Sequence, residues 1–335
     1  MFVRWKVRAV MGPDGAVAIL LATFNGAPYL RSLLDSIEAQ SSTEWFMWTR
    51  DDGSTDATIE QLQRFEERHQ DRMRRVRDHE RLGARGSFDR LLSSAFDASR
   101  AQYFFFCDQD DVWHVDKVER LVAGIRDAES RVGASTPILL HSDLRVVGPG
   151  LEIMHPSLKE HQRVDASVWR GFRQLLVQNV VTGCAAVVNR ALVRRMGGIP
   201  EEAVMHDWWS ALVAAAFGQV VYYPYATVDY RQHATNVIGA QEVGLLKLLH
   251  KGWKGMAITE MLTRRARQAE AFQHEFGGTL APAEAEALAE FLAAMRSPAL
   301  LRGARLTTRG FAMSSLSRTL GLFAPVALSE GHNES

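Results

Sequence analysis

The stretch FFFCDQDDVW, residues 104–113, passes from an apolar block directly into three acidic residues, Asp108, Asp110 and Asp111. The apolar block is typical of a strand that is buried on both faces. Three carboxylates at the end of such a strand repel one another, so we expect something positive between them. A divalent cation such as Mg²⁺ or Mn²⁺ meets this need, because it prefers oxygen ligands and usually shares its shell with substrate phosphates. A solvated acidic turn that caps the following helix is the simpler alternative.

Strand and helix patterns alternate on both sides of this stretch. Apolar runs predict strands over 16–24, 44–55, 72–78 and 102–108, and apolar residues at helical spacing predict helices over 28–40, 56–71 and 86–99. This order predicts an α/β fold with a mostly parallel central sheet flanked by helices, a Rossmann-like nucleotide-binding half. Beyond about residue 240 the chain becomes more basic, and its pattern predicts a helical C-terminal extension.

Polar motifs follow three of the expected strands. They are TFNG at 23–26, RDDGSTD at 50–56 and CDQDD at 107–111. Ligands of open parallel sheets bind outside the carboxyl ends of the strands, so we expect the three motifs to meet at one edge. The Asp-Gly turn of the second motif is also typical of a plain turn before a helix cap, and both interpretations can hold together.

Two later motifs carry further candidate residues. In MHDWWSALVAAAFG, 205–218, Asp207 heads an apolar helix, where the helix dipole stabilises a negative charge and a general base is one interpretation. A helix cap with packed tryptophans is the other. In YRQHATNVIG, 230–239, a neutral imidazole of His233 could complete a metal shell and Arg231 could reach a phosphate, although a lone histidine is more often structural.

Composition narrows the class of protein. The chain has 335 residues, is 47% hydrophobic and 23% charged, and has a formal net charge of +0, so no overall charge draws it to nucleic acid. Its two cysteines form neither a metal-type spacing nor a disulfide framework. We find no signal peptide and no convincing membrane span, and expect a cytoplasmic protein.

Together, the five segments ATFNG, RDDGSTD, CDQDDVW, HDWW and YRQHATNVIG resemble glycosyltransferase family 2, the inverting nucleotide-sugar transferases of GT-A fold. They occur in that family's order and cover about residues 16–240. The combination of CDQDDVW and YRQH looks most like the rhamnosyltransferase-like branch, which builds bacterial surface polysaccharides. The sequence departs from the family at Arg81-Leu82-Gly83, where an Asn-X-Gly is frequent.

The resemblance implies roles on the donor side. Thr23 and Asn25 would lie near the nucleoside, Asp52 would hydrogen-bond the pyrimidine base, and Asp108 would contact the ribose or donor sugar. Arg231 is our candidate for the donor phosphates.

The resemblance also implies a metal site and a catalytic base. Asp110 would bind a Mn²⁺ or Mg²⁺ ion that bridges the diphosphate, with His233 as a further ligand, and Asp207 would be the base. The implied partners are a nucleotide-diphosphate sugar donor, with dTDP-rhamnose as the candidate, and a saccharide or lipid-linked glycan acceptor, with no nucleic acid.

Other classes of protein remain open. A nucleotidyltransferase acting on a sugar phosphate also uses an acidic metal site, but it usually carries a Gly-rich basic loop after the first strand, which TFNGAPYL lacks. A phosphohydrolase with an aspartyl nucleophile would need a lysine partner and a Ser or Thr after the acids. A non-catalytic module for a nucleotide sugar or a lipid carrier would bind donor without releasing nucleotide.

The expected organisation is a lead-in at 1–15, a GT-A glycosyltransferase domain at 16–240 and a helical region at 241–335. In that last region, 243–258 and 300–328 combine basic residues with aliphatic and aromatic ones and contain no acid. This pattern suits helices in a membrane interface, which would place the protein peripherally on the inner face of the cytoplasmic membrane. Helices that pack on the transferase domain, with solvated cations, are the alternative.

Overall fold

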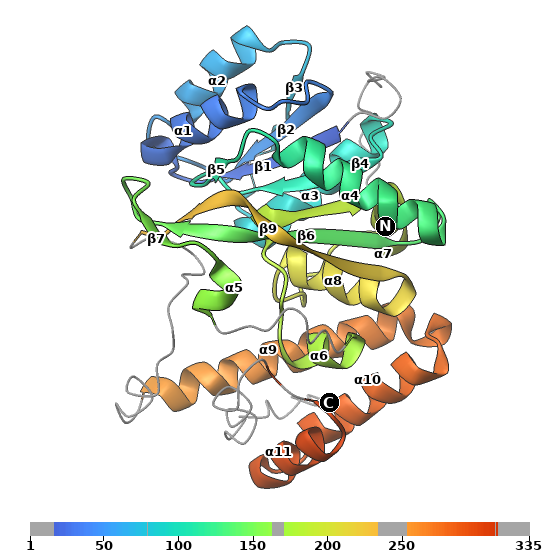
Figure 1. Ribbon diagram of the computed structural model, residues 1–335. Coiled ribbons are helices and arrows are strands. Elements are labelled where there is room, and N and C mark those ends of the chain that lie inside the picture. Colours follow the sequence, from blue (N-terminus) through green and yellow to red (C-terminus); the bar gives the residue numbers. More distant parts are fainter. Residues whose placement is uncertain (1–16, 79, 163–170, 234–252, 312, 314–335) are drawn as a thin grey trace. The chain divides into compact units, whose positions relative to one another are not determined.

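The computed structural model describes residues 17–78, 80–162, 171–233, 253–311 and 313 (Figure 1). The expected lead-in lies outside the described residues, as do most of 243–258 and of 300–328. Among the helices of the described ranges, none has both the length and the apolar character needed to cross a bilayer.

The first part of the chain alternates strands and helices as expected. In chain order the elements are β1 Val17–Thr23, α1 Ala27–Glu38, β2 Trp45–Asp51, α2 Thr58–Arg68, β3 Met73–Arg75, α3 Gly83–Ala98, β4 Tyr103–Cys107, β5 Val112–Trp113 and α4 Lys117–Val132. Strand β4 is buried along its whole length, as its continuous apolar run predicts. The expected strand over 44–55 ends at Asp51, because the Asp-Gly sequence begins the turn before α2.

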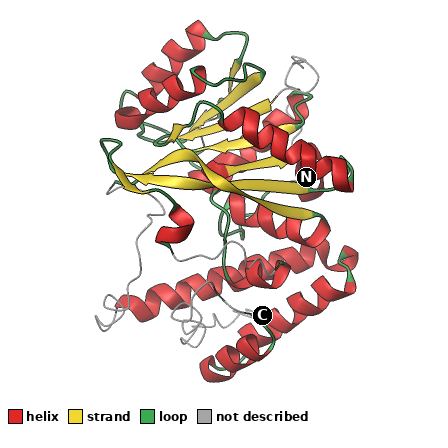
Figure 2. Cartoon of the chain, in the orientation of Figure 1, coloured by secondary structure: helices red, strands yellow, loops and turns green. Residues whose placement is uncertain are grey.

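The rest of the chain adds long strands and then helices. The elements are β6 Ile138–Val147, β7 Ile153–His155, α5 Leu158–His161, α6 Phe172–Val177, β8 Ala186–Asn189, α7 Arg190–Met196, α8 His206–Phe217, β9 Gln219–Arg231, α9 Trp253–Phe276, α10 Pro282–Met295 and α11 Ala299–Thr308. Figure 2 shows the strands gathered into one sheet, with helices alongside it.

The sheet has the strand order β3-β2-β1-β4-β8-β6-β9-β5, and β7 pairs with β6. Pairing is parallel from β3 to β4, and β8 then runs antiparallel to both of its neighbours, β4 and β6. Strand β9 returns parallel to β6. The α/β class with a helix-flanked sheet and C-terminal helices is confirmed. The expected parallel pairing holds from β3 to β4, whereas β8, β7 and β5 pair antiparallel with their neighbours, so the sheet is mixed.

The chain divides into two compact units. The first comprises residues 1–158, 181–201 and 205–239 and contains the sheet; the second comprises 159–180, 202–204 and 240–335. In the second unit α10 packs against α6, α9 and α11, and Arg173 of α6 pairs with Glu290 of α10 at 2.5 Å. The division of the chain at residue 240 into a transferase domain and a helical region stays a prediction.

Candidate active site

The three strand-end motifs meet at one edge of the sheet. Thr23 at the end of β1 lies opposite Asp51 of β2, and Leu21 lies opposite Cys107 of β4. The side chain of Gln109 joins the loops after β1 and β4, because its amide nitrogen donates to the Phe24 carbonyl at 2.9 Å and its amide oxygen accepts from the Phe24 N–H at 2.8 Å. A Cβ at Gly26 would lie 2.2 Å from the Gln109 Oε1, so any larger residue there would displace this side chain from Phe24.

Thr23 and Asn25 connect the loop after β1 to the turn after β2. The Thr23 hydroxyl donates to Asp51 Oδ1 at 2.8 Å, and Asn25 Oδ1 accepts from the Thr55 N–H at 2.8 Å. Asn25 has a φ of 48°, a left-handed conformation that asparagine tolerates better than most residues. The Thr23 side chain is buried, whereas Asn25 is exposed at the edge where a nucleoside is expected.

Asp52 is buried and fixed by donors on several sides. Its Oδ1 accepts from Arg50 Nη1 at 2.7 Å and from the Leu82 N–H at 2.7 Å, and its Oδ2 accepts from the Gly83 N–H at 2.9 Å. Burial alone would raise the pKa of Asp52, but these hydrogen bonds and the Arg50 charge outweigh it and lower the pKa. Asp52 is therefore a rigid carboxylate, and the segment that departs from the family pattern supplies its backbone donors.

Arg50 is a site residue that the sequence reasoning missed. Its guanidinium is fully buried and also pairs with Asp78 at 2.6 Å. The signal was present in the sequence, because an arginine inside the strand pattern EWFMWTR needs a partner. Nothing in the sequence indicates that Asp78 and Asp52 are its partners.

The two predicted metal ligands are in contact. His233 Nε2 lies 2.8 Å from Asp110 Oδ2, and the imidazole stacks on the ring of Tyr29 with 4.6 Å between the centroids. Burial and then the nearby carboxylates of Asp110 and Asp207 raise the pKa of Asp108 to about 7. The side chains of Asp108, Asp110, His233 and Asp207 therefore lie close together, and the charges of Asp110 and Asp207 act on Asp108.

Beneath these acids lies a buried cation that the sequence reasoning also missed. Lys117 has no exposed surface; its Nζ donates to the Cys184 carbonyl at 2.5 Å and lies 3.5 Å from the centroid of the Trp113 ring. Burial lowers the pKa of Lys117 to about 8, against the attraction of Asp111 and Asp108. Part of the positive charge that the acidic motif requires thus comes from the protein itself.

Arg231 makes several contacts within the protein that the sequence does not predict. Its guanidinium donates to the carbonyls of Asp110 at 2.7 Å and Pro149 at 2.5 Å and to the Ser32 hydroxyl at 3.0 Å, while its backbone N–H donates to Asp111 Oδ1 at 3.1 Å. Through these hydrogen bonds Arg231 fixes the conformation of the acidic turn. A contact between Arg231 and donor phosphate stays a prediction.

Asp207 lies in the first turn of α8 and is 7% exposed. Its Oδ1 accepts from the Trp208 N–H at 2.6 Å. The preceding His206 packs between the rings of Phe88 and Phe106, and burial lowers its pKa to about 3, so this imidazole is neutral. The helix start and the packed aromatic rings hold Asp207 at the same edge as the other acids, close enough for its charge to raise the pKa of Asp108.

The donor set fits a hard divalent cation. Asp108 and Asp110 supply carboxylate oxygens and His233 supplies a nitrogen, a combination that Mn²⁺ and Mg²⁺ sites use. A second group, Asp108, Asp111 and Cys184, has its ligand atoms within 4.8 Å of one another. A thiol is a soft ligand, whereas Mn²⁺ and Mg²⁺ prefer oxygen ligands, so Cys184 is a poor ligand for such an ion. The set that includes Asp110 is therefore the better candidate.

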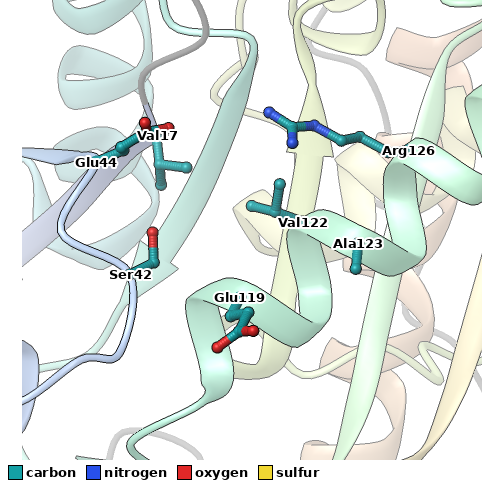
Figure 3. Close-up of a pocket in the computed structure, with 7 residues that line it drawn as sticks. All are labelled: Val17, Ser42, Glu44, Glu119, Val122, Ala123 and Arg126. Atoms are coloured by element: carbon teal, nitrogen blue, oxygen red, sulfur yellow. The ribbon is translucent and has the colours of Figure 1, made fainter.

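A surface pocket elsewhere on the sheet unit does not belong to this site. It is lined by Val17, Ser42, Glu44, Glu119, Val122, Ala123 and Arg126 (Figure 3). Val17 begins β1, whereas Thr23 ends it, so the pocket lies at the opposite end of that strand from the acids.

A helix-flanked sheet with acidic residues at its strand ends is typical of α/β enzymes that bind nucleotides, and comparison with known proteins indicates a family. Residues 18–146 match the model of Glycosyl transferase family 2. The match places a domain similar to this family in the first part of the chain, and supports a glycosyltransferase activity for it. The matched residues include the motifs after β1, β2 and β4.

Curated relatives agree with this family. The chain is 22% identical to the dTDP-rhamnosyl transferase RfbG of Shigella flexneri over 229 residues, which is 66% of this chain and 74% of that protein. It is 32% identical over 104 residues to the putative teichuronic acid biosynthesis glycosyltransferase TuaG of Bacillus subtilis, a match covering 31% of this chain and 39% of the other.

Solved structures confirm the GT-A fold. TarS 1–349 of S. aureus, in complex with UDP-GlcNAc, matches with a TM-score of 0.53 and 14% identity over 92% of this chain and 89% of that one. The mannosyltransferase PcManGT of Pyrobaculum calidifontis, in complex with GDP-Man and Mn²⁺, matches with a TM-score of 0.52 and 17% identity over 95% and 88% of the two chains.

The buried lysine leads to a stability prediction. Lys117→Met should lower the free energy of unfolding of the metal-free protein by about 2 kcal/mol, because it leaves a buried carbonyl without its donor and removes a cation from beside two acids. Denaturant unfolding in chelator measures this. Adding Asp111→Asn to Lys117→Met should recover part of the loss, and a double variant with purely additive losses would rule out charge balance as the cause.

Proposed function

We propose that the protein is a metal-dependent, inverting glycosyltransferase that moves rhamnose from dTDP-rhamnose to a saccharide acceptor during assembly of a bacterial surface polysaccharide. The observation that carries the proposal is the convergence of Asp52, Asp108, Asp110 and Asp207 on the strand-end edge of a family 2 domain. The similarity to RfbG supports rhamnose as the donor sugar. The donor complexes of TarS and PcManGT support a nucleotide sugar as the donor class.

In the proposed reaction, the chain holds the donor at the strand ends. Asp52, fixed by Arg50 and the Leu82 and Gly83 N–H groups, presents a carboxylate toward the base without needing to reorganise. Asp108 contacts the ribose or donor sugar, with Thr23 and Asn25 near the nucleoside. Asp110 and His233 would hold a Mn²⁺ or Mg²⁺ ion, which would offset the charge that develops on the leaving diphosphate.

Asp207 acts on the acceptor. Its carboxylate takes the proton of the acceptor hydroxyl as the hydroxyl oxygen bonds to the anomeric carbon. The bond from that carbon to the phosphate oxygen breaks in the same displacement, and the nucleoside diphosphate leaves. Attack opposite the leaving group inverts the anomeric configuration without a covalent enzyme intermediate.

We also propose a location for this reaction. A lipid-linked glycan is the acceptor class that the resemblance implies, and it would be met at the cytoplasmic leaflet of the membrane. The basic segments 243–258 and 300–328 remain our candidates for peripheral attachment there.

A donor screen tests the proposal. Release of nucleoside diphosphate should be fastest from dTDP-rhamnose when it is compared with UDP-, GDP- and other dTDP-sugars in the presence of acceptor glycans. Faster release from another donor would overturn the assignment of rhamnose as the donor sugar. It would not contradict the proposal that the protein is a glycosyltransferase. Donor binding without release from any donor would favour the non-catalytic module instead.

Metal dependence is expected from the Asp110–His233 pair. Excess chelator should abolish turnover, and Mn²⁺ or Mg²⁺ should restore it. Asp110→Ala should weaken Mn²⁺ binding by at least about tenfold in calorimetry, since even residues that only support ligands cost this much. Asp116→Ala, at a half-exposed acid beyond the turn that pairs with Arg120, is the matched control and should bind Mn²⁺ as the wild type does. Full turnover in chelator would exclude a metal role.

The role of Asp207 is tested by Asp207→Asn, which is nearly isosteric. It should keep the donor affinity of the wild type and lower kcat by about two to four orders of magnitude, the usual contribution of a general base. Steady-state kinetics with donor and acceptor varied separately provides both values. A kcat within a few-fold of the wild type would mean that another group accepts the proton.

A further inference from the structure

The hairpin between β6 and β7 exposes apolar side chains beside the candidate active site. We call residues 148–155, GPGLEIMH, the hairpin tip. In this tip Ile153 is 61% exposed, Met154 is 62% exposed and Leu151 is 38% exposed. Figure 1 shows β7 at the far end of the long strand β6. Single exposed apolar residues are normal on protein surfaces, but three within four residues of one turn form a continuous apolar feature.

The conformation of Leu151 adds to this observation. Its φ of 68° lies in the left-handed region, which glycine or asparagine adopts at much lower cost than leucine. Turn formation alone therefore favours another residue at this position. A leucine that is both strained and half-exposed suggests that its side chain serves a contact outside the folded unit.

The backbone of the tip is largely satisfied from within. The Gly148 N–H donates to the Glu152 carbonyl at 2.9 Å, the Leu151 N–H donates to the Gly148 carbonyl at 3.0 Å, and the Gly150 N–H donates to Glu152 Oε2 at 3.0 Å. A turn with these donors already paired can enter a medium of low polarity without leaving them unbonded. Glu152 is the sole acidic residue of the tip, and this hydrogen bond uses its carboxylate within the turn.

The tip is also anchored to the acidic turn. Arg231 donates both to the Pro149 carbonyl of the tip and to the Asp110 carbonyl of the acidic turn. One buried guanidinium therefore connects the tip to the acidic turn. The Gln232 N–H adds a bond to the Val147 carbonyl at 2.8 Å. A surface that contacts the tip is thereby held next to the groups that are proposed to transfer the sugar.

We propose that the hairpin tip inserts Leu151, Ile153 and Met154 into the interface of a lipid bilayer and so presents the active site to a membrane-bound acceptor. This inference rests on the proposed function for the choice of acceptor. The tip carries no lysine or arginine, so its contact with lipid depends on apolar insertion and little on anionic headgroups. Attachment through the basic C-terminal segments would show the opposite dependence.

Vesicle sedimentation with the full chain tests the insertion. Wild type should bind phosphatidylcholine vesicles, and should keep that binding at high salt. Ile153→Ser with Met154→Ser should lower the partition coefficient about fivefold, and Met154→Trp should raise it, because tryptophan favours the membrane interface. The gain expected of Met154→Trp keeps the test decisive if the serine variant folds poorly. Val115→Ser is the matched control, since Val115 is 58% exposed in the loop after β5 and should not affect binding.

Several results would overturn the insertion. They are equal binding by wild type and the serine variant, an equal loss in Val115→Ser, no vesicle binding, or binding that needs phosphatidylglycerol and disappears at high salt. The last result would assign attachment to the basic segments. A change in oligomeric state in the serine variant without vesicle binding would instead make the tip a contact between two copies.

Nucleotide release with a water-soluble acceptor is measured separately. The serine variant should release nucleotide as fast as wild type does in this assay. A wild type that releases none would contradict the proposed function while leaving the vesicle result valid.

Discussion

The buried acidic turn after β4 is the constraint on which the rest of the site depends. Asp111 has no exposed surface and Asp108 has a pKa raised to about 7, so burial and mutual repulsion both oppose this arrangement. Two buried cations offset the negative charge of the turn. Lys117, shortly after the turn in sequence, lies below the acids, and Arg231, from much later in the chain, binds the turn at the Asp110 carbonyl. The protein itself therefore offsets only part of the charge of the acidic turn, which is consistent with the proposed metal ion.

The sequence predicts the location of the site better than its internal connections. Hydrophobic periodicity is a local property, so the parallel strands and the common edge for the motifs around Thr23, Asp52 and Asp110 follow from the sequence alone. The partners of Arg50 and Lys117 depend on which segments meet in three dimensions. Arg231 illustrates the difference, because its place at the edge was predicted while the acceptors it binds were not.

Sheet topology explains why the second half was harder to predict. Strand β8 has only four residues, yet it lies between β4 and β6 and runs antiparallel to both. Short buried strands carry little periodic signal, and their neighbours are far away in sequence. This insertion has a consequence for the site, because β8 follows the turn at Gly183–Ala185, whose Cys184 carbonyl accepts the bond from Lys117.

The site therefore has two levels with different mechanical properties. The lower level, with Asp111, Lys117 and the Cys184 carbonyl, is fully buried and supports the acids above it. The upper level, with Asp108, Asp110, His233 and Asp207, retains partial exposure and unbalanced negative charge. A donor that arrives with a cation brings charge of both signs to this upper level, so binding can relieve the repulsion that folding leaves in place. Under this arrangement, the affinity for donor and the affinity for metal should each strengthen the other, since both act on the same carboxylates.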